Sequence, residues 1–119
     1  MQLTRLPALS EAAASELRRG GPASLWADIV SDVRQGWAHV FTTTNGSYLI
    51  LRVDGDDLVI LAASGHNGNA MMQACVELAR TLKLKNVRFH TAKKGLPRLL
   101  SRFNPVEVER VFEVRVNEN

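Results

Sequence analysis

The sequence predicts an α+β (α/β sandwich-like) domain with a mixed β-sheet. Residues 37–63 have the pattern of three successive antiparallel strands. Residues 58–91 have the order strand, helix, strand, which implies a parallel pair joined by a right-handed crossover. Two amphipathic helices are expected earlier, within residues 8–35. A length of 119 residues, with 45% hydrophobic and 23% charged residues, predicts a single domain over residues 1–119.

The first third of the chain predicts two helices, after a short strand at residues 2–6. Residues 8–19 place apolar side chains at four-residue spacing, and Ser10 is a suitable N-cap. Residues 23–35 form a clear amphipathic pattern, and Gly36 fits the position just after a helix end. We expect the two tryptophans near this second helix, Trp26 and Trp37, to pack in the core.

The middle of the chain predicts a three-stranded meander. Strands are expected at 37–44 and 47–53, joined by Asn45-Gly46, the preferred pair for a type I′ hairpin turn. A second tight turn at Asp54-Gly55-Asp56 leads into a third strand at 58–63. This third strand is apolar on both faces, which predicts a central, covered position in the sheet.

The last part of the chain alternates helices and strands. Residues 69–82 predict a helix with Cys75 and the methionines at 71 and 72 on its apolar side. A strand at 86–91 and a short helix at 96–103 follow. Residues 106–116 alternate apolar and polar side chains strictly, which predicts one long half-buried strand.

The charge distribution leaves open which partner the protein binds. The net charge is +3, but the interval 80–102 contains eight basic residues and no acidic one. Such an interval can attract the phosphates of a cofactor or of nucleic acid, or it can be an ordinary solvated surface. Its only aromatic residues are Phe89 and, just beyond it, Phe103, which argues against a stacking platform for single strands.

The number and spacing of cysteines and histidines argue against a disulfide and against a metal site. Cys75 is the only cysteine, so an internal disulfide is impossible, and a buried structural thiol is expected. His39, His66 and His90 lack zinc-ligand spacing, so no metal site is expected. The N-terminus has no secretory pattern and no apolar run is long enough to span a bilayer, so we expect a cytoplasmic protein without a membrane partner.

A glycine-bearing loop between the strand at 58–63 and the helix at 69–82 is the most informative local feature. Unpaired N–H groups and the positive end of the helix dipole suit a phosphate at a helix N-terminus. The loop is neither a P-loop nor a GxGxxG motif, because no Lys-Ser or Lys-Thr follows Gly68 and no glycine precedes Gly65 at the required spacing. The alternative interpretation is that the glycines only form the turn between strand and helix and bind no ligand.

The order of elements resembles the GCN5-related N-acetyltransferase (GNAT) family over nearly the whole chain. The family signature, R/Q-x-x-G-x-G/A, aligns with GHNGNA at residues 65–70. Gly68 and Ala70 match this signature, whereas Gly65 stands in place of Arg or Gln. The segment VRFHTAKKGLPRLLSRF also resembles the family's fifth strand and fourth helix. In length and in the general character of its sequence, the chain resembles small GNAT-like proteins encoded by phages.

The resemblance implies that acetyl-CoA is the cofactor. The loop would hold the pyrophosphate, and the main chain of the preceding strand would pair with the pantetheine arm. The implied cofactor-binding residues are Leu61, Ala62, Ala63, Gly65, His66, Asn67, Gly68, Asn69 and Ala70. Attack of an amine on the thioester would need a base, donors for the oxyanion and an acid for the leaving thiolate.

The implied catalytic residues are only partly present. The family commonly has a tyrosine in its fourth helix that acts as the general acid. This chain has Leu100 followed by Ser101 there, and its only tyrosine is Tyr48. No glutamate near residues 58–63 matches the usual base, although three aspartates lie nearby, at 54, 56 and 57.

Two hypotheses about function follow. One is acetyl transfer from acetyl-CoA to a small-molecule or peptide amine. The other is a catalytically inactive GNAT-fold module that binds protein or nucleic acid. A homodimer is also possible.

Overall fold

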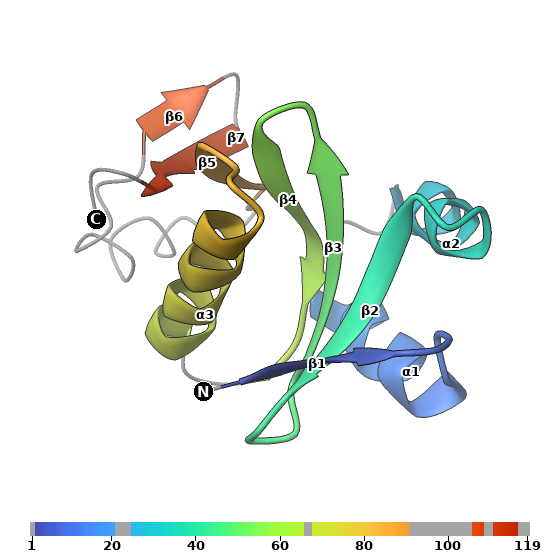
Figure 1. The fold of residues 1–119 in the computed structure, drawn as a ribbon. Coiled ribbons are helices and arrows are strands. Elements are labelled where there is room, and N and C mark those ends of the chain that lie inside the picture. The colour runs from blue at the N-terminus through green and yellow to red at the C-terminus, as the bar shows by residue number, and fades with distance from the viewer. Residues whose placement is uncertain (1, 21–24, 66–67, 91–105, 109–110, 117–119) are drawn as a thin grey trace.

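A computed structural model describes residues 2–20, 25–65, 68–90, 106–108 and 111–116. The elements appear in the order that the sequence predicts up to residue 90 (Figure 1). In chain order they are β1 (Leu3–Leu6), α1 (Glu11–Gly20), α2 (Trp26–Arg34), β2 (Ala38–Thr43), β3 (Tyr48–Asp54), β4 (Asp57–Ala63), α3 (Gly68–Thr81), β5 (Asn86–His90), β6 (Val106–Val108) and β7 (Val111–Arg115). The predicted helix at 96–103 lies outside the described residues.

The described strands form one seven-stranded mixed sheet in the order β1-β2-β3-β4-β5-β7-β6. Neighbouring strands are antiparallel except β4 and β5, which pair in parallel from Asp57↔Asn86 to Ile60↔Phe89. The predicted crossover and the central position of β4 are therefore confirmed. Two apolar faces explain this position: a strand that is apolar on both sides gains most burial where helices cover both faces.

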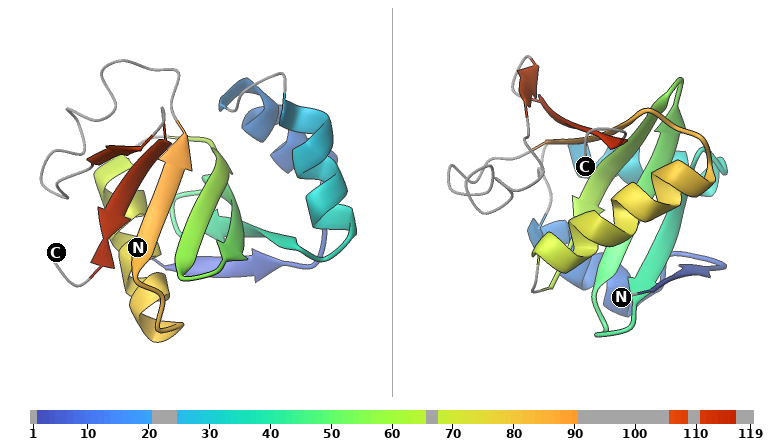
Figure 2. Two further views of the ribbon diagram at one scale, coloured as in Figure 1. Left: turned by 90° about the horizontal axis from the view of Figure 1, so that it is seen from above. Right: turned by 60° about the vertical axis from the view of Figure 1, so that its left-hand side comes forward.

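The two faces of the sheet carry different helices and different cores. Helix α3 packs on one face against β4 and β5, whereas α1 and α2 pack on the other, against β2, β3 and β4 (Figure 2). The core under α3 contains Leu49, Leu51, Leu58, Met71, Met72, Cys75, Val76, Ala79, Val87, Phe89, Val114 and Val116. The core under α1 and α2 contains Ala13, Leu17, Ile29, Ala38, Val40, Ile50 and Ala62.

Helix α1 begins where the sequence predicts, with Ser10 as its cap. The Ser10 Oγ accepts a hydrogen bond of 3.1 Å from the N–H of Ala13, one of the donors that a helix N-terminus leaves unpaired. Arg52 of β3 then fixes α2 against the sheet through an ion pair of 2.9 Å with Asp32. Both side chains are about 30% exposed, so this pair contributes position more than stability.

The β2–β3 hairpin differs from the predicted turn. Gly46 has a φ of +84°, but among the described residues only Lys83 is a non-glycine residue with positive φ, so Asn45 does not adopt the conformation of a type I′ turn. The N–H of Gly46 instead donates to the carbonyl of Thr43, and Thr43 pairs with Ser47 through a 2.9 Å bond. The loop is a three-residue type I turn closed by a left-handed glycine, an arrangement that the same sequence also permits.

Two further expectations are wrong. Residues 106–116 are not one strand, because β6 and β7 pair with each other as an antiparallel hairpin, with Val108 opposite Val111. The alternation of apolar residues runs through the reversal, so periodicity alone could not locate it. Trp37 is 59% exposed rather than part of the core, and the Arg52 guanidinium lies 5.4 Å from the centre of its ring. Trp26, by contrast, packs against the core under α1 and α2.

Cys75 is fully buried under α3, as expected, and burial raises the pKa of its thiol to about 12. In an unfolded chain a cysteine thiol ionises near pH 8.5. Between these two values the unfolded chain loses a proton that the folded protein keeps, so this thiol makes folding less favourable as pH rises.

We therefore predict that the free energy of unfolding falls with pH above about 9, by up to about 1.4 kcal/mol per pH unit from this thiol. Urea unfolding of the wild type and of Cys75→Ala at several pH values isolates the effect, since all other groups are shared. The stability advantage of the wild type should shrink as pH rises. An advantage that stays constant from pH 8 to 10.5 would contradict the prediction.

Candidate functional site

An extra residue in β4 marks the candidate site. Leu51 of β3 pairs with Ile60 and the preceding Ile50 pairs with Ala62, so Leu61 has no partner in the β3 register. This is a β-bulge, which bends a strand and breaks the regular alternation of its side chains.

Side-chain packing around Leu61 agrees with the bulge. Ile60 and Ala63 both pack against the core under α3. Leu61 and Ala62, between them, both pack against the core under α1 and α2. In a regular strand these two neighbours would face opposite sides. The bulge therefore resets the alternation of β4 three residues before the glycine loop.

The same segment extends past the end of the parallel ladder. Among the described residues, the last pair between β4 and β5 is Ile60↔Phe89, whereas β4 continues to Ala63 and remains paired with β3. The N–H of Ser64 donates to the carbonyl of Tyr48 at 2.9 Å. Because successive peptide groups in a strand point in opposite directions, the N–H of Ala63 points toward the β5 side. Main-chain groups of residues 61–63 are thus offered along an edge where the described strands have separated.

The opposite end of the β4–β5 pair is held together by side chains. Asp57 accepts a 2.8 Å hydrogen bond from Asn86 and forms a 2.9 Å ion pair with Arg88. The carbonyl of Asp56 accepts bonds from the N–H groups of Lys85 and Asn86. The two parallel strands are clamped where they begin and are free to separate after Ile60.

The first residues of the glycine loop are anchored to β3 and α1. The Ser64 Oγ accepts a hydrogen bond of 3.1 Å from the N–H of Tyr48 and donates one of 3.4 Å to Glu16 of α1. Gly65 has a φ of +95°, and a Cβ at this position would overlap the Ser47 side chain. Only glycine fits at position 65, for reasons of both conformation and space.

Helix α3 begins at Gly68, three residues after Gly65. The first turn of α3 contains Asn69 and Ala70 and has no acidic residue, so no negative charge there opposes an anion. Of the residues expected to hold the cofactor, Leu61, Ala62 and Ala63 lie at the end of β4, Gly65 follows them, and Gly68, Asn69 and Ala70 form the start of α3. His66 and Asn67 lie outside the described residues.

Of the described acidic side chains, Glu16 reaches this strand end, where it accepts the hydrogen bond from Ser64. The aspartates near the start of β4 are engaged elsewhere. The Asp57 carboxylate is occupied by Arg88 and Asn86, and Asp56 is exposed and lies 3.7 Å from Lys85 at the far end of β4. His39 is half-buried on β2. Within the described part of the chain, no three histidine, cysteine or acidic residues are grouped to hold a metal ion. No described helix is long and apolar enough to cross a membrane.

Tyr48 is a residue that the sequence pattern did not connect to the site. It lies on β3 beside Ser64, and it packs half-buried against the same core as Leu61 and Ala62. The signal available in the sequence was weak, because only the hairpin register shows that Tyr48 lies next to the start of the glycine loop.

We predict that Gly65→Ala lowers the free energy of unfolding by about 2–4 kcal/mol, since it combines a strained φ with an overlap on Ser47. Gly55→Ala is the matched control: Gly55 also has positive φ, +60°, but a Cβ there meets nothing within 4 Å. It should cost about 1 kcal/mol.

Chemical denaturation of both variants and of the double variant Gly65→Ala/Ser47→Gly measures the two contributions separately. Removing the Ser47 side chain should recover part of the loss in Gly65→Ala. Equal losses at positions 55 and 65, with no recovery, would show that Ser47 does not restrict the loop.

Comparisons with known proteins agree with this architecture. No protein-family model and no curated protein sequence matches the chain. Among solved structures, an acetyltransferase from Bacillus subtilis in complex with CoA superposes with a TM-score of 0.67 at 10% identity, covering 96% of this chain and 97% of that one. Ard1 from Thermoplasma volcanium superposes with a TM-score of 0.54 at 15% identity, covering 95% of each chain. At these identities the similarity concerns the fold, and the fold of this protein is GNAT-like.

Proposed function

We propose that this protein is an N-acetyltransferase that uses acetyl-CoA and an amine acceptor. The observation that carries the proposal is the combination in β4 of the bulge at Leu61 with a parallel ladder that ends at Ile60. It leaves main-chain donors and acceptors along a strand end that runs straight into a helix N-terminus. A cofactor with an amide-bearing arm and a pyrophosphate matches that sequence of groups.

The residues present fit such a cofactor. The main chain of Leu61, Ala62 and Ala63 would pair with the amides of the pantetheine arm. The loop and first turn of α3, from Gly65 through His66, Asn67, Gly68 and Asn69 to Ala70, would supply N–H groups to the pyrophosphate. The similar Bacillus subtilis acetyltransferase was solved with CoA, which supports the same class of ligand here.

The departure from the family signature at position 65 has a structural explanation. Arg or Gln stands there in the family pattern, but in this protein Ser47 occupies the space that a Cβ would need. The contribution of that side chain to phosphate binding is therefore replaced by main-chain N–H groups alone, which predicts weaker binding than the full signature would give. It does not remove the helix N-terminus that the pyrophosphate would use.

When bound, the thioester supplies the electrophilic acetyl carbon. The protein has to orient the amine, accept its proton and provide hydrogen bonds to the oxyanion. Asp57 is engaged in the clamp and is a poor base, because its two carboxylate oxygens are already bonded to Asn86 and Arg88. Glu16, whose carboxylate accepts a 3.4 Å hydrogen bond from Ser64, is a described side chain that reaches this end of β4 and could accept that proton.

A GNAT-fold binding module without acetyl transfer is the second candidate. The bonds of Asp57 to Asn86 and Arg88 favour this binding module, because they leave no free carboxylate to serve as the usual base in the described part of β4. Nucleic acid is a less suitable partner than the charge count suggests. Arg88 and Lys85 pair with aspartates, and Arg80 donates to the carbonyl of Val116 at 3.0 Å. No described contact or comparison supports a homodimer, a phage origin or a cellular location.

We predict that acetyl-CoA or CoA raises the melting temperature, because a ligand that binds only the folded state stabilises it by mass action. Gly68→Asp should abolish the rise, since it places a negative charge at the start of α3. Ala27→Asp is the control: it adds an acid to the first turn of α2, at an exposed position away from the loop.

Thermal shift and calorimetry should give the wild-type response for Ala27→Asp and none for Gly68→Asp. If saturating CoA produces neither a shift nor heat with the wild type, the cofactor assignment fails.

We also predict slow chemistry. A missing general acid typically costs about 10²–10⁴-fold in rate, so thiol release from acetyl-CoA should be detectable but slow with polyamine, peptide N-terminal and aminoglycoside acceptors. Ser101→Ala should leave this rate nearly unchanged, since Leu100 aligns with the family's tyrosine. Rapid release, or loss of release in Ser101→Ala, would show that an acid is present. CoA binding without any thiol release would favour the binding module.

A further inference from the structure

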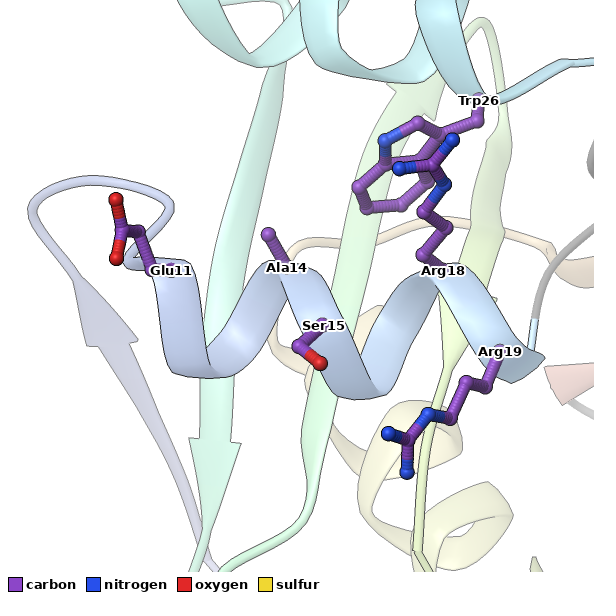
Figure 3. A pocket seen from close by; sticks show the side chains of 6 residues that line it. All are labelled: Glu11, Ala14, Ser15, Arg18, Arg19 and Trp26. Atoms are coloured by element: carbon purple, nitrogen blue, oxygen red, sulfur yellow. The ribbon is translucent and has the colours of Figure 1, made fainter.

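A concave surface lies on the helix side of the molecule, between α1 and the start of α2. It is a hollow of about 550 Å³ lined by Glu11, Ala14, Ser15, Arg18, Arg19 and Trp26 (Figure 3). Its size is in the range of small-molecule sites. In the view of Figure 3 the strands lie behind the two helices, so the hollow opens on the side that faces away from the sheet.

Charges of opposite sign stand at the two ends of this hollow. Glu11, Ala14 and Arg18 lie on one stripe of α1. Arg18 reaches toward Trp26 at the start of α2, whereas the Glu11 carboxylate turns toward the N-terminal end of α1 (Figure 3). Glu11 and Arg18 are seven residues apart, which corresponds to about 10 Å along a helix axis. Arg19 points the other way and borders the hollow from the opposite side.

The surface between the two charges is largely apolar. The methyl group of Ala14 forms its floor, and the indole of Trp26 forms a wall beside Arg18 (Figure 3). Trp26 is half-buried, because part of its ring packs against the core under α1 and α2. A half-buried aromatic ring is held in place and offers a fixed face to a ligand.

Helix-dipole compensation explains part of this arrangement. An acid in the first turn of α1 and bases in its last turn stabilise the helix wherever they point. It does not explain why Glu11 and Arg18 share one stripe with Ala14, or why a tryptophan from another helix lines the same hollow. Helix α2 has equivalent charges, Asp28 in its first turn and Arg34 in its last, which do not line the hollow.

We propose that the hollow binds an elongated zwitterion, a molecule with an amine at one end and a carboxylate at the other. Glu11 receives the amine, Arg18 receives the carboxylate, and Ala14 and Trp26 contact the hydrocarbon between them. Arginine suits a carboxylate because its planar fork can donate two parallel hydrogen bonds. This inference does not depend on acetyl transfer, and the hollow is distinct from the glycine loop.

The test uses 6-aminohexanoate as the probe, without acetyl-CoA. NMR follows the indole N–H of Trp26, and exposed Trp37 serves as an internal reference. Substituting Trp37 by Phe assigns the two signals. The probe should shift the Trp26 signal in a saturable manner. Hexanoate, hexylamine and the short 3-aminopropanoate should each bind about 10-fold or more weakly, since each lacks a charge or the required length.

Two pairs of variants separate binding from helix stability. Arg18→Met and Glu11→Gln should each weaken 6-aminohexanoate about 10-fold or more. Arg34→Met and Asp28→Asn remove equivalent charges from the ends of α2 and should leave the affinity unchanged. All four positions lie on helix surfaces, and melting temperatures show that each variant is folded.

Three outcomes would overturn the proposal. The first is no saturable shift of the Trp26 signal. The second is equal binding of hexanoate or hexylamine, which would indicate a site for one charge only. The third is an equal loss of affinity in the α2 variants. None of these outcomes bears on CoA binding, which is measured separately by thermal shift.

Discussion

The structure depends on how β4 is held at its two ends. At its start, Asp57 joins β4 to β5 through Asn86 and Arg88, so the only parallel pair in the described sheet has a fixed register. Toward its end, the bulge at Leu61 shifts the phase of the strand and the ladder to β5 stops. Because β4 is clamped to β5 at one end and unpaired from it at the other, main-chain groups near its end are exposed to a ligand. The strand still remains the centre of the sheet and contributes to both cores.

The glycine loop is positioned by contacts from strands that are distant in sequence. Ser64 is bonded to Tyr48 and to Glu16, and Gly65 lies against Ser47, so the β2–β3 hairpin and α1 together determine where the loop leaves β4. This close packing leaves room only for glycine at position 65. Because Glu16 lies on α1, this helix contacts the loop directly.

The sequence was sufficient for features that depend on local pattern and burial. The two-faced apolar strand β4, its crossover to β5 and the buried thiol of Cys75 follow from hydrophobicity alone, and all three are confirmed. The bulge at Leu61 could not be predicted, since every residue from 58 to 63 is apolar and a phase shift leaves no mark in such a run. The role of Gly65 depends on contact with Ser47, which only the tertiary structure brings near. The β6–β7 hairpin was not predicted, because apolar and polar residues alternate without a break through residues 106–116.

The central claim is that the separated end of β4 and the start of α3 form one cofactor site. The most direct measurement is an NMR titration of backbone amide signals with CoA. We expect the largest changes at Ala63 and at residues 65–70, with little change at Asp57 and Asn86 in the clamp. Changes confined to the sheet edges or to the α1–α2 hollow, or an absence of change at saturating CoA, would contradict the claim.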